Sequence, residues 1–273
     1  MIKLCAGLVV ALLALAPTTA AHELRLDGPL IQGGLVLGKA EPDAEVRLNG
    51  DRVRVSPEGL FLVGFGRDDE GPFELVVRHP DGSVTRESLA IEKRAYQVQR
   101  IDGLPAAMVT PDEAALARIR SENAMIADVR ARDTPEALFA AGFVWPVTGP
   151  ISGVYGSQRI LNGEPRRPHF GVDIAAPEGT PVRAPADGVV ALAEDDLYFT
   201  GGTVMLDHGH GLTSVFSHLS AVTAAVGERV SQGAVIGRVG ATGRATGAHL
   251  DWRVNLFKTR LDPALLVGPM PGE

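Results

Sequence analysis

The sequence predicts a mostly β protein with two domains and a linker that contains one helix. Three observations predict it: 32 glycines and 19 prolines divide the 273 residues, short apolar runs alternate with polar positions between these turns, and a helical pattern occurs in one stretch only. We expect a β-sandwich-like domain at residues 22–98, a linker with a helix at 99–142, an antiparallel β-sheet domain at 143–268 and a tail at 269–273. A chain of this length can form two modest hydrophobic cores.

Residues 1–21 have the composition of an export signal. Lys3 precedes an apolar stretch from Leu4 to Ala16, and Thr19-Ala20-Ala21 supplies small residues for cleavage. This stretch is too short to span a bilayer as a helix. We therefore expect an exported protein, periplasmic or extracellular, with no transmembrane span in the mature chain. Cleavage also removes Cys5, the single cysteine, so disulfides and thiolate metal ligands are not expected.

Alternating runs predict the amino-terminal sandwich. Two such runs flank Asn49-Gly50-Asp51, which is a strong hairpin signal. A further alternating run begins at Phe73 and is followed by the turn Pro80-Asp81-Gly82. Short strands with turns at this spacing are typical of an immunoglobulin-like sandwich. His79, beside the second turn, is expected to be a surface residue.

One helix is predicted in the linker. Thr110-Pro111-Asp112-Glu113 combines an N-cap residue, a proline at the first helical position and a capping-box glutamate. Leu116, Ile119 and Ile126 form one apolar face. We expect a connecting helix that packs on one domain, and the alternative is an arm that binds a partner.

The second domain begins near Phe143, where short strands alternate with Gly and Pro turns and no further helical pattern occurs. Such a pattern predicts an antiparallel sheet folded on itself. The predicted strands include Asp187–Val190, Thr203–Leu206, Thr213–Phe216 and Val235–Val239.

The charge of the chain excludes some classes of partner. The formal net charge is -7, so the chain as a whole lacks the basic surface that nucleic acid binding requires. No basic run is present that could hold anionic lipid. We predict no nucleic acid partner.

Histidines and aspartates in the second domain have the spacing of a zinc hydrolase. His169 and Asp173, four residues apart, can converge on one metal ion, and His249 and Asp251, two apart in an extended strand, point to the same face. Three protein ligands leave the fourth position of zinc for water, which is the arrangement of catalytic zinc sites. His218 lies between the two pairs.

This domain resembles the lysostaphin-type, or LytM-type, zinc endopeptidases of peptidase family M23. The resemblance runs from Phe143 to Val267, and it implies an exported enzyme or scaffold that acts on peptidoglycan. As an enzyme it would use one zinc ion and hydrolyse peptide bonds of peptidoglycan stems or cross-bridges. It rests on His169-x-Gly-x-Asp173, Ala176-Pro-Glu-Gly-Thr-Pro-Val182 with Asp187-Gly188, Ser217-His218-Leu219, Gly227-x-x-Val230-x-x-Gly233-x-x-Ile236-Gly237 and Thr242-Gly-x-x-Thr-Gly-x-His249-Leu250.

The resemblance also implies the roles of the site residues. His169 and Asp173 match two zinc ligands, and His218 and His249 match the two active-site histidines that do not bind the metal. Asp251 stands where the family has its third ligand, a histidine. The resemblance does not assign which of His218 and His249 transfers the proton and which stabilises the oxyanion.

Asp251 is the departure that decides the function. Aspartate is a legitimate zinc ligand, but two carboxylates and one imidazole neutralise the dication and weaken it as a Lewis acid. Arg253 lies on the same strand face and can pair with Asp251. The alternatives are therefore a degenerate, non-catalytic regulator of another cell-wall hydrolase, or a module that only binds peptidoglycan. The hydrolase is the preferred interpretation because the other four site residues remain.

Other conspicuous residues receive structural interpretations. His208 and His210 are expected at a turn or a groove wall, not at a metal. Gly240 to Gly247 is expected to be a connection that shapes the groove, because it lacks the ending of a phosphate-binding loop. Trp252 alternates with the site residues, so it should pack on the far side of its strand.

Overall fold

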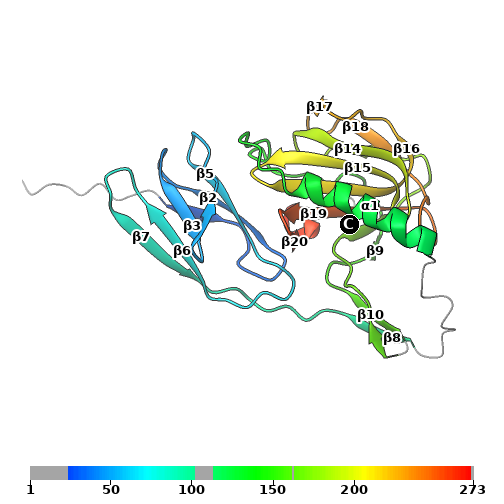
Figure 1. Cartoon of the computed structure of the whole chain (residues 1–273), viewed down its shortest axis with the longest axis horizontal. Coiled ribbons are helices and arrows are strands. Elements are labelled where there is room, and N and C mark those ends of the chain that lie inside the picture. The colour runs from blue at the N-terminus through cyan, green and yellow to red at the C-terminus, as the bar shows by residue number, and fades with distance from the viewer. Residues whose placement is uncertain (1–23, 102–112, 162, 272–273) are drawn as a thin grey trace, which may run out of the picture.

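The structure, a computed structural model, describes residues 24–101, 113–161 and 163–271. The expected signal sequence at residues 1–21 and most of the expected helix cap, Thr110 to Asp112, lie outside the described residues. Two β regions lie side by side along the molecule, and one helix crosses the larger of them (Figure 1). The fold is mostly β, as the sequence predicts. No helix within the described ranges is long and apolar enough to cross a membrane.

Two antiparallel sheets form the amino-terminal region. Val36 and Phe61 from one sheet pack against Val46, Leu75 and Val77 from the other, so the predicted alternation does create one buried core. In spatial order, the first sheet contains β1 (Arg25–Asp27), β2 (Leu35–Lys39) and β5 (Leu60–Gly64). The second contains β4 (Asp51–Val53), β3 (Glu45–Leu48), β6 (Phe73–Arg78) and β7 (Val84–Leu89).

The hairpin predicted at Asn49-Gly50 joins β3 to β4. Asn49 has φ 48° and Gly50 has φ 86°. Both values lie in the left-handed region that a two-residue type I′ turn requires, and asparagine and glycine are the residues that tolerate it best. The hairpin is confirmed.

The expectation that His79 lies at the surface is wrong. Its ring is buried, with Nδ1 3.0 Å from Glu41 Oε2 and Nε2 2.7 Å from Thr85 Oγ1. Glu41 is distant in sequence from His79. The local turn signal therefore could not indicate that the Glu41 carboxylate would pair with the His79 ring.

The carboxy-terminal region is a ten-stranded sheet in which every neighbouring pair is antiparallel. The four predicted strands are present in it. Its main path contains, in spatial order, β17 (Arg229–Val230), β14 (Gly188–Leu197), β15 (Gly201–Gly209), β16 (Leu212–Val222), β19 (His249–Leu256), β12 (Val172–Ala175) and β9 (Ile151–Gly153). β18 (Val235–Val239) pairs with β16 and with β13 (Pro181–Arg183), and β20 (Thr259–Leu261) pairs with β19. The chain then enters a short 3-10 helix, Pro263–Leu265.

A third, small sheet ties the linker to the carboxy-terminal region. β8 (Val98–Ile101) pairs in parallel with β10 (Gln158–Leu161), which pairs with β11 (Glu164–Pro165). Gln158 Nε2 donates to the Arg166 carbonyl at 2.7 Å, so this sheet positions the segment that leads to His169. The sequence does not predict the pairing, because parallel strands so far apart are brought together only by the tertiary fold.

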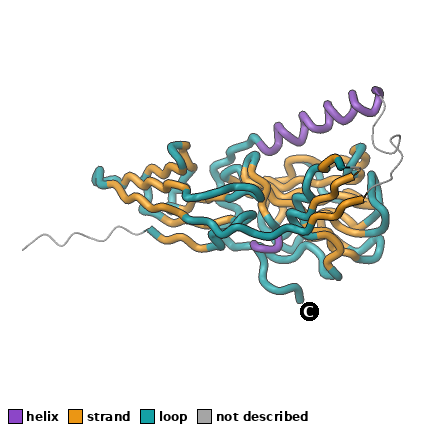
Figure 2. Tube along the Cα trace, turned by 90° about the horizontal axis from the view of Figure 1, so that it is seen from below, coloured by secondary structure: helices purple, strands orange, loops and turns teal. Residues whose placement is uncertain are grey.

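Helix α1 (Glu113–Arg130) lies across the carboxy-terminal sheet (Figures 1 and 2). Ile126 and Val129 pack against a core that includes Met205 and Val215. The helix therefore packs on one β region, as expected. Leu116 does not belong to the buried face, since it is 38% exposed.

His208 on β15 is a structural residue. Its side chain is completely buried, with Nδ1 2.6 Å from the Asp187 carbonyl and Nε2 2.8 Å from Ser214 Oγ. Burial lowers the pKa of His208 to about 4. The imidazole is therefore neutral at neutral pH.

The stability of the protein toward acid is expected to depend on His208. The unfolded imidazole has a pKa of about 6.5 and the folded one of about 4, so between these pH values the unfolded state binds more protons and the free energy of unfolding falls as the pH falls. The loss across this window is about 3 kcal/mol. Urea unfolding of the wild type and of His208→Gln between about pH 4 and pH 7 measures it. An equal pH dependence in both proteins would contradict the assignment.

Candidate active site

Strands β12 and β19 position the carboxylates of the candidate metal site. Asp173 on β12 lies directly opposite Asp251 on β19 in the antiparallel register. Residues in such a pair project to the same face of the sheet. The site therefore depends on one strand pairing as well as on local spacing.

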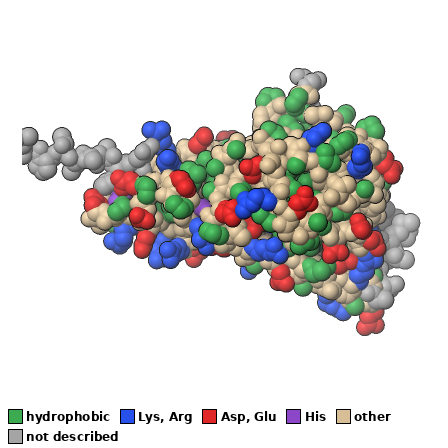
Figure 3. Space-filling view, turned by 90° about the horizontal axis from the view of Figure 1, so that it is seen from above, with side chains coloured by type: hydrophobic (Ala, Val, Ile, Leu, Met, Phe, Trp, Pro, Cys, Tyr) green, Lys and Arg blue, Asp and Glu red, His purple; other side chains and the backbone are tan. Residues whose placement is uncertain are grey.

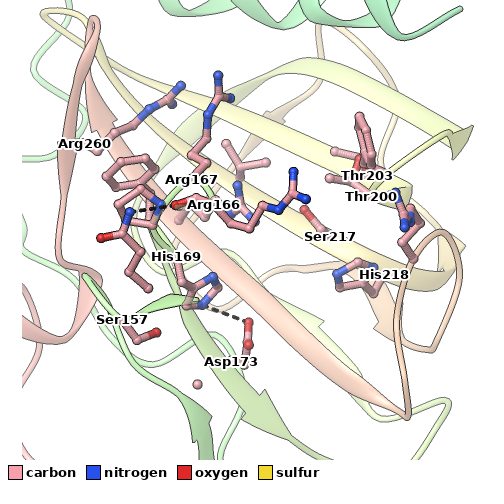
Figure 4. A pocket seen from close by; sticks show the side chains of 18 of the residues that line it. Ser157, Arg166, Arg167, His169, Asp173, Thr200, Thr203, Ser217, His218 and Arg260 are labelled. Atoms are coloured by element: carbon pink, nitrogen blue, oxygen red, sulfur yellow. Dashed lines mark hydrogen bonds and ion pairs between the residues drawn. The ribbon is translucent and has the colours of Figure 1, made fainter. Parts of the chain in front are cut away.

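His169, Asp173 and Asp251 lie close enough together to hold one metal ion. One ligand atom from each lies within 4.8 Å of the others. His169 Nε2 lies 3.1 Å from Asp173 Oδ1, and a dashed line joins the two side chains in Figure 4. Yet both atoms are buried and neither makes a hydrogen bond. Buried polar atoms without partners are costly, and two of them beside a third ligand atom fit a metal ion that would satisfy both.

His218 lies at a bulge in β16. The residues Phe216 and Leu219 of β16 pair with Val204 and Gly202 of β15, so one extra residue is accommodated there. His218 itself has φ 66°, a conformation that is uncommon for residues other than glycine. Bulges redirect side chains and are frequent beside active sites. Here the bulge places the imidazole in the cleft that also contains His169 and Asp173 (Figure 4).

The rings of His218 and His249 have the same hydrogen-bonding arrangement. Nδ1 of His218 donates to the Thr242 carbonyl at 2.8 Å, and Nδ1 of His249 donates to the Gly247 carbonyl at 2.9 Å. This leaves Nε2 of each ring free to accept a proton. The ring centroids are 4.7 Å apart, and His249 Nε2 lies 3.9 Å from Asp173 Oδ1. Burial lowers the pKa of His218, although its bond to the Thr242 carbonyl acts in the opposite direction.

Arg253 binds the carboxylate of Asp251, as the alternative interpretation of the sequence predicts. Arg253 Nε lies 2.9 Å from Oδ1 and 3.0 Å from Oδ2, and Nη2 also donates to Oδ2. The Asp251 side chain is 3% exposed and that of Arg253 is 31% exposed. Burial alone raises the pKa of Asp251, but the Arg253 guanidinium outweighs it and the pKa is lowered overall. Asp251 is thus ionised at neutral pH.

The close packing around Gly171 explains why the His169-x-Gly-x-Asp173 motif has a glycine at this position. A Cβ at Gly171 would lie 2.6 Å from Arg253 Cγ, 2.6 Å from the Trp252 carbonyl oxygen and 2.7 Å from Asp251 Oδ1. A larger residue would therefore push β19 away from the loop that carries His169.

The site opens into a cleft of about 1530 Å³ between helix α1 and the sheet. The sequence interpretation missed two features of this cleft. Helix α1 supplies one wall through Ile119, Asn123 and Ile126, so it is more than a connector. The remaining walls carry several arginines, and only the Arg166-Arg167 pair just before His169 could have indicated them from sequence.

The expectation that His208 lies at a turn or a groove wall is wrong, because it lies within β15 and is completely buried. His210, Trp252 and the connection from Gly240 to Gly247 lie where they were expected. His210 has φ 52° in the connection after β15, and its Nε2 donates to the Pro135 carbonyl at 3.1 Å. Trp252 is fully buried on the core side of β19. The connection from Gly240 to Gly247 contributes the Thr242 carbonyl that holds His218, and Arg244 of the same connection lines the cleft.

Comparison with known proteins places this geometry in a family. The model of Peptidase family M23 matches residues 167–263. A crystal structure from Pseudomonas aeruginosa assigned to peptidase family M23 is 33% identical, with a TM-score of 0.67, and the alignment covers 86% of this chain and 94% of that one. The chain belongs to peptidase family M23. Family M23 consists of metallopeptidases, so the group of His169, Asp173 and Asp251 lies in the domain where a metal is expected.

Two curated relatives of this M23 chain carry activities in their names. DD-carboxypeptidase/endopeptidase Mpg of Neisseria meningitidis is 43% identical over 105 residues, which are 38% of this chain and 24% of that protein. Peptidoglycan DD-endopeptidase ShyA of Vibrio cholerae is 39% identical over 102 residues, which are 34% of this chain and 24% of that protein. The match thus spans about a quarter of the length of these relatives.

Proposed function

We propose that this M23 chain is an exported, zinc-dependent endopeptidase that hydrolyses peptide bonds in peptidoglycan stems or cross-bridges. The observation that carries the proposal is the pair of buried atoms His169 Nε2 and Asp173 Oδ1, which lie 3.1 Å apart without a hydrogen bond to any group, beside the Asp251 carboxylate. The names of its relatives, which include a peptidoglycan DD-endopeptidase, support the substrate class. The amino-terminal signal pattern supports export.

His169, Asp173 and Asp251 would hold the ion. Zinc supplies a Lewis acid for the scissile carbonyl and lowers the pKa of water. Nε2 of His218 or His249 accepts a proton from water and later returns it to the leaving amine. Both rings are already fixed for this role, since each Nδ1–H is held by a backbone carbonyl.

Arg253 changes the expected charge of the site. Two carboxylates alone would neutralise a zinc ion, but the Arg253 guanidinium neutralises one of them. The residues around the ion then carry one net negative charge, as two histidines and one aspartate would. Arg253 thereby offsets the loss of Lewis acidity that the sequence alone predicts for Asp251.

Metal content and muropeptide release test the proposal together. The mature wild type should bind about one zinc ion per chain and release soluble muropeptides from purified sacculi. Asp251→Ala should lose both, because only two ligands remain, whereas Asp251→His should keep the metal. Equal release by the wild type and Asp251→Ala would remove Asp251 from the mechanism.

The second candidate function is a non-catalytic regulator of another cell-wall hydrolase. The observation that favours it is the Arg253 guanidinium on both oxygens of Asp251, which competes with a metal for that carboxylate. The same contact between Arg253 and Asp251 also favours a module that only binds peptidoglycan. A wild type that binds sacculi but neither takes up zinc nor releases muropeptides would establish a role of this kind and overturn the endopeptidase proposal.

A further inference from the structure

Arginines dominate the charged lining of the cleft. Among the residues that the structure describes, six arginines line it, against two acidic residues, Glu122 and Asp173. Glu122 is already engaged, because it pairs with Arg118 at 2.6 Å and accepts from the Tyr198 amide at 2.9 Å. The excess of positive charge contrasts with the formal net charge of -7 for the chain. The six arginines are Arg130, Arg166, Arg167, Arg244, Arg253 and Arg260.

Three of these arginines form what we call the arginine cluster: Arg130, Arg167 and Arg260. None of the three pairs with a carboxylate among the described residues. Arg130, at the end of α1, has a buried Nε without a hydrogen-bond partner, and Arg260 donates only to the neutral amide oxygen of Asn255. Arg167 extends toward the same end of the cleft as Arg260 (Figure 4).

The members of the arginine cluster repel one another. Burial, followed by the charges of Arg260, Arg253 and Arg167, lowers the pKa of Arg130 to about 9. Burial and the charges of Arg253 and Arg167 likewise lower the pKa of Arg260 to about 10. Guanidinium groups that line one cleft without a carboxylate partner among the described residues form a site that an anion would stabilise.

We propose that the arginine cluster binds carboxylates of the peptide that lies in the cleft, so that the protein selects acidic peptides over peptides whose carboxyl groups are amidated. This inference rests on the proposed function, because it takes the bound peptide to be the substrate. Arg167 is two residues from His169 and opens into the same cleft, which places the subsite beside the point of cleavage. The planar fork of a guanidinium matches a carboxylate through two parallel hydrogen bonds.

The surroundings favour a short acidic peptide over a polyanion such as nucleic acid. A long polyanion needs a continuous basic path along the surface. On the face drawn in Figure 3, acidic and basic side chains are interspersed among apolar ones. The concentration of arginines is therefore a property of the cleft and not of that outer face.

A matched pair of synthetic peptides tests the selection. One peptide carries two free carboxylates and the other carries carboxamides at the same positions, so the two differ in charge but hardly in shape. Isothermal titration calorimetry with the mature, chelator-treated protein measures both dissociation constants without hydrolysis. We expect the acidic peptide to bind at least about tenfold more tightly. Equal dissociation constants would overturn the proposal.

Substitutions locate the effect. Arg167→Gln and Arg130→Gln should each remove most of the preference for the acidic peptide, while the affinity for the carboxamide peptide stays the same. Arg229→Gln is the matched control, because Arg229 is an exposed arginine of the same sheet that pairs with Glu136 outside the cleft. A thermal melt of each variant verifies that it is folded. A preference that survives in the folded Arg130→Gln, Arg167→Gln double variant would refute the assignment.

Competition with inorganic phosphate distinguishes recognition of carboxylates from general anion binding. Inorganic phosphate should displace the acidic peptide only at concentrations far above those of the peptide, whereas displacement at equal concentration would contradict carboxylate selection. Because no step of this experiment requires catalysis, the arginine cluster can fail its test while the endopeptidase proposal stands. Conversely, the protein can prefer the acidic peptide and yet release no muropeptides, in which case the endopeptidase proposal fails while the arginine cluster passes its test.

Discussion

Replacing His218 with alanine is expected to lower peptide-bond hydrolysis by about 10²- to 10⁴-fold, the usual contribution of a positioned general acid–base. The Thr242 carbonyl holds Nδ1–H of His218, so Nε2 is the free nitrogen, and burial lowers the pKa so that the ring stays neutral and able to accept a proton. The acid limb of the rate profile should accordingly lie below the ordinary histidine pKa of 6.5. Muropeptide release from sacculi as a function of pH measures both effects.

The control for His218→Ala is the metal content. His218 is outside the group of His169, Asp173 and Asp251, so the variant should retain zinc at the wild-type level. His210→Ala serves as the matched histidine substitution, because the His210 ring contacts the Pro135 carbonyl. If His218→Ala released muropeptides at the wild-type rate, or if it lost zinc together with activity, the proton-transfer role would be excluded.

Arg253→Gln is expected to destabilise the chelator-treated protein by about 3 kcal/mol, because it leaves the buried Asp251 carboxylate without its ion-pair partner. The value is at the lower end for buried pairs because the Arg253 side chain is 31% exposed. Saturating zinc should restore most of the lost stability, since the dication pairs with the same carboxylate. Urea unfolding with and without zinc gives the free energies.

The double variant Asp251→Asn, Arg253→Gln is the matched control for this experiment. It removes both charges, so it should lose less stability than Arg253→Gln alone and should gain less from zinc. The comparison decides between the two candidate functions. An Arg253→Gln protein that zinc stabilises no more than it does the double variant would show that Asp251 does not bind the metal, which favours the regulator.

Much of the fold could be predicted because its signals are local. Asn49-Gly50 specifies its turn through two positive φ angles, and alternation along β19 separates Asp251 from the buried Trp252. His79 shows that local signals cannot predict burial, since the carboxylate that pairs with its ring, that of Glu41, comes from another part of the chain. The parallel pairing of β8 with β10 likewise leaves no local pattern.

The candidate site divides in the same way. The spacing of His169 with Asp173, and of Asp251 with Arg253, indicates which side chains can meet, and the structure brings both pairs together. His218 could be named from its motif, but its left-handed backbone and the bulge around it could not. Whether His169, Asp173 and Asp251 bind zinc stays a prediction.

By itself, the sequence determined the β character of the chain, its resemblance to family M23 and the Asp251–Arg253 alternative, because each depends on periodicity or on motifs that can be read directly along the chain. Only the tertiary structure decided that Arg130 from a helix, Arg167 from a loop and Arg260 from a strand line one cleft. It also decided how deeply Asp251 is buried. The physical reason is that charge repulsion and desolvation depend on distance and packing in space, which residues far apart in sequence acquire only when the chain folds.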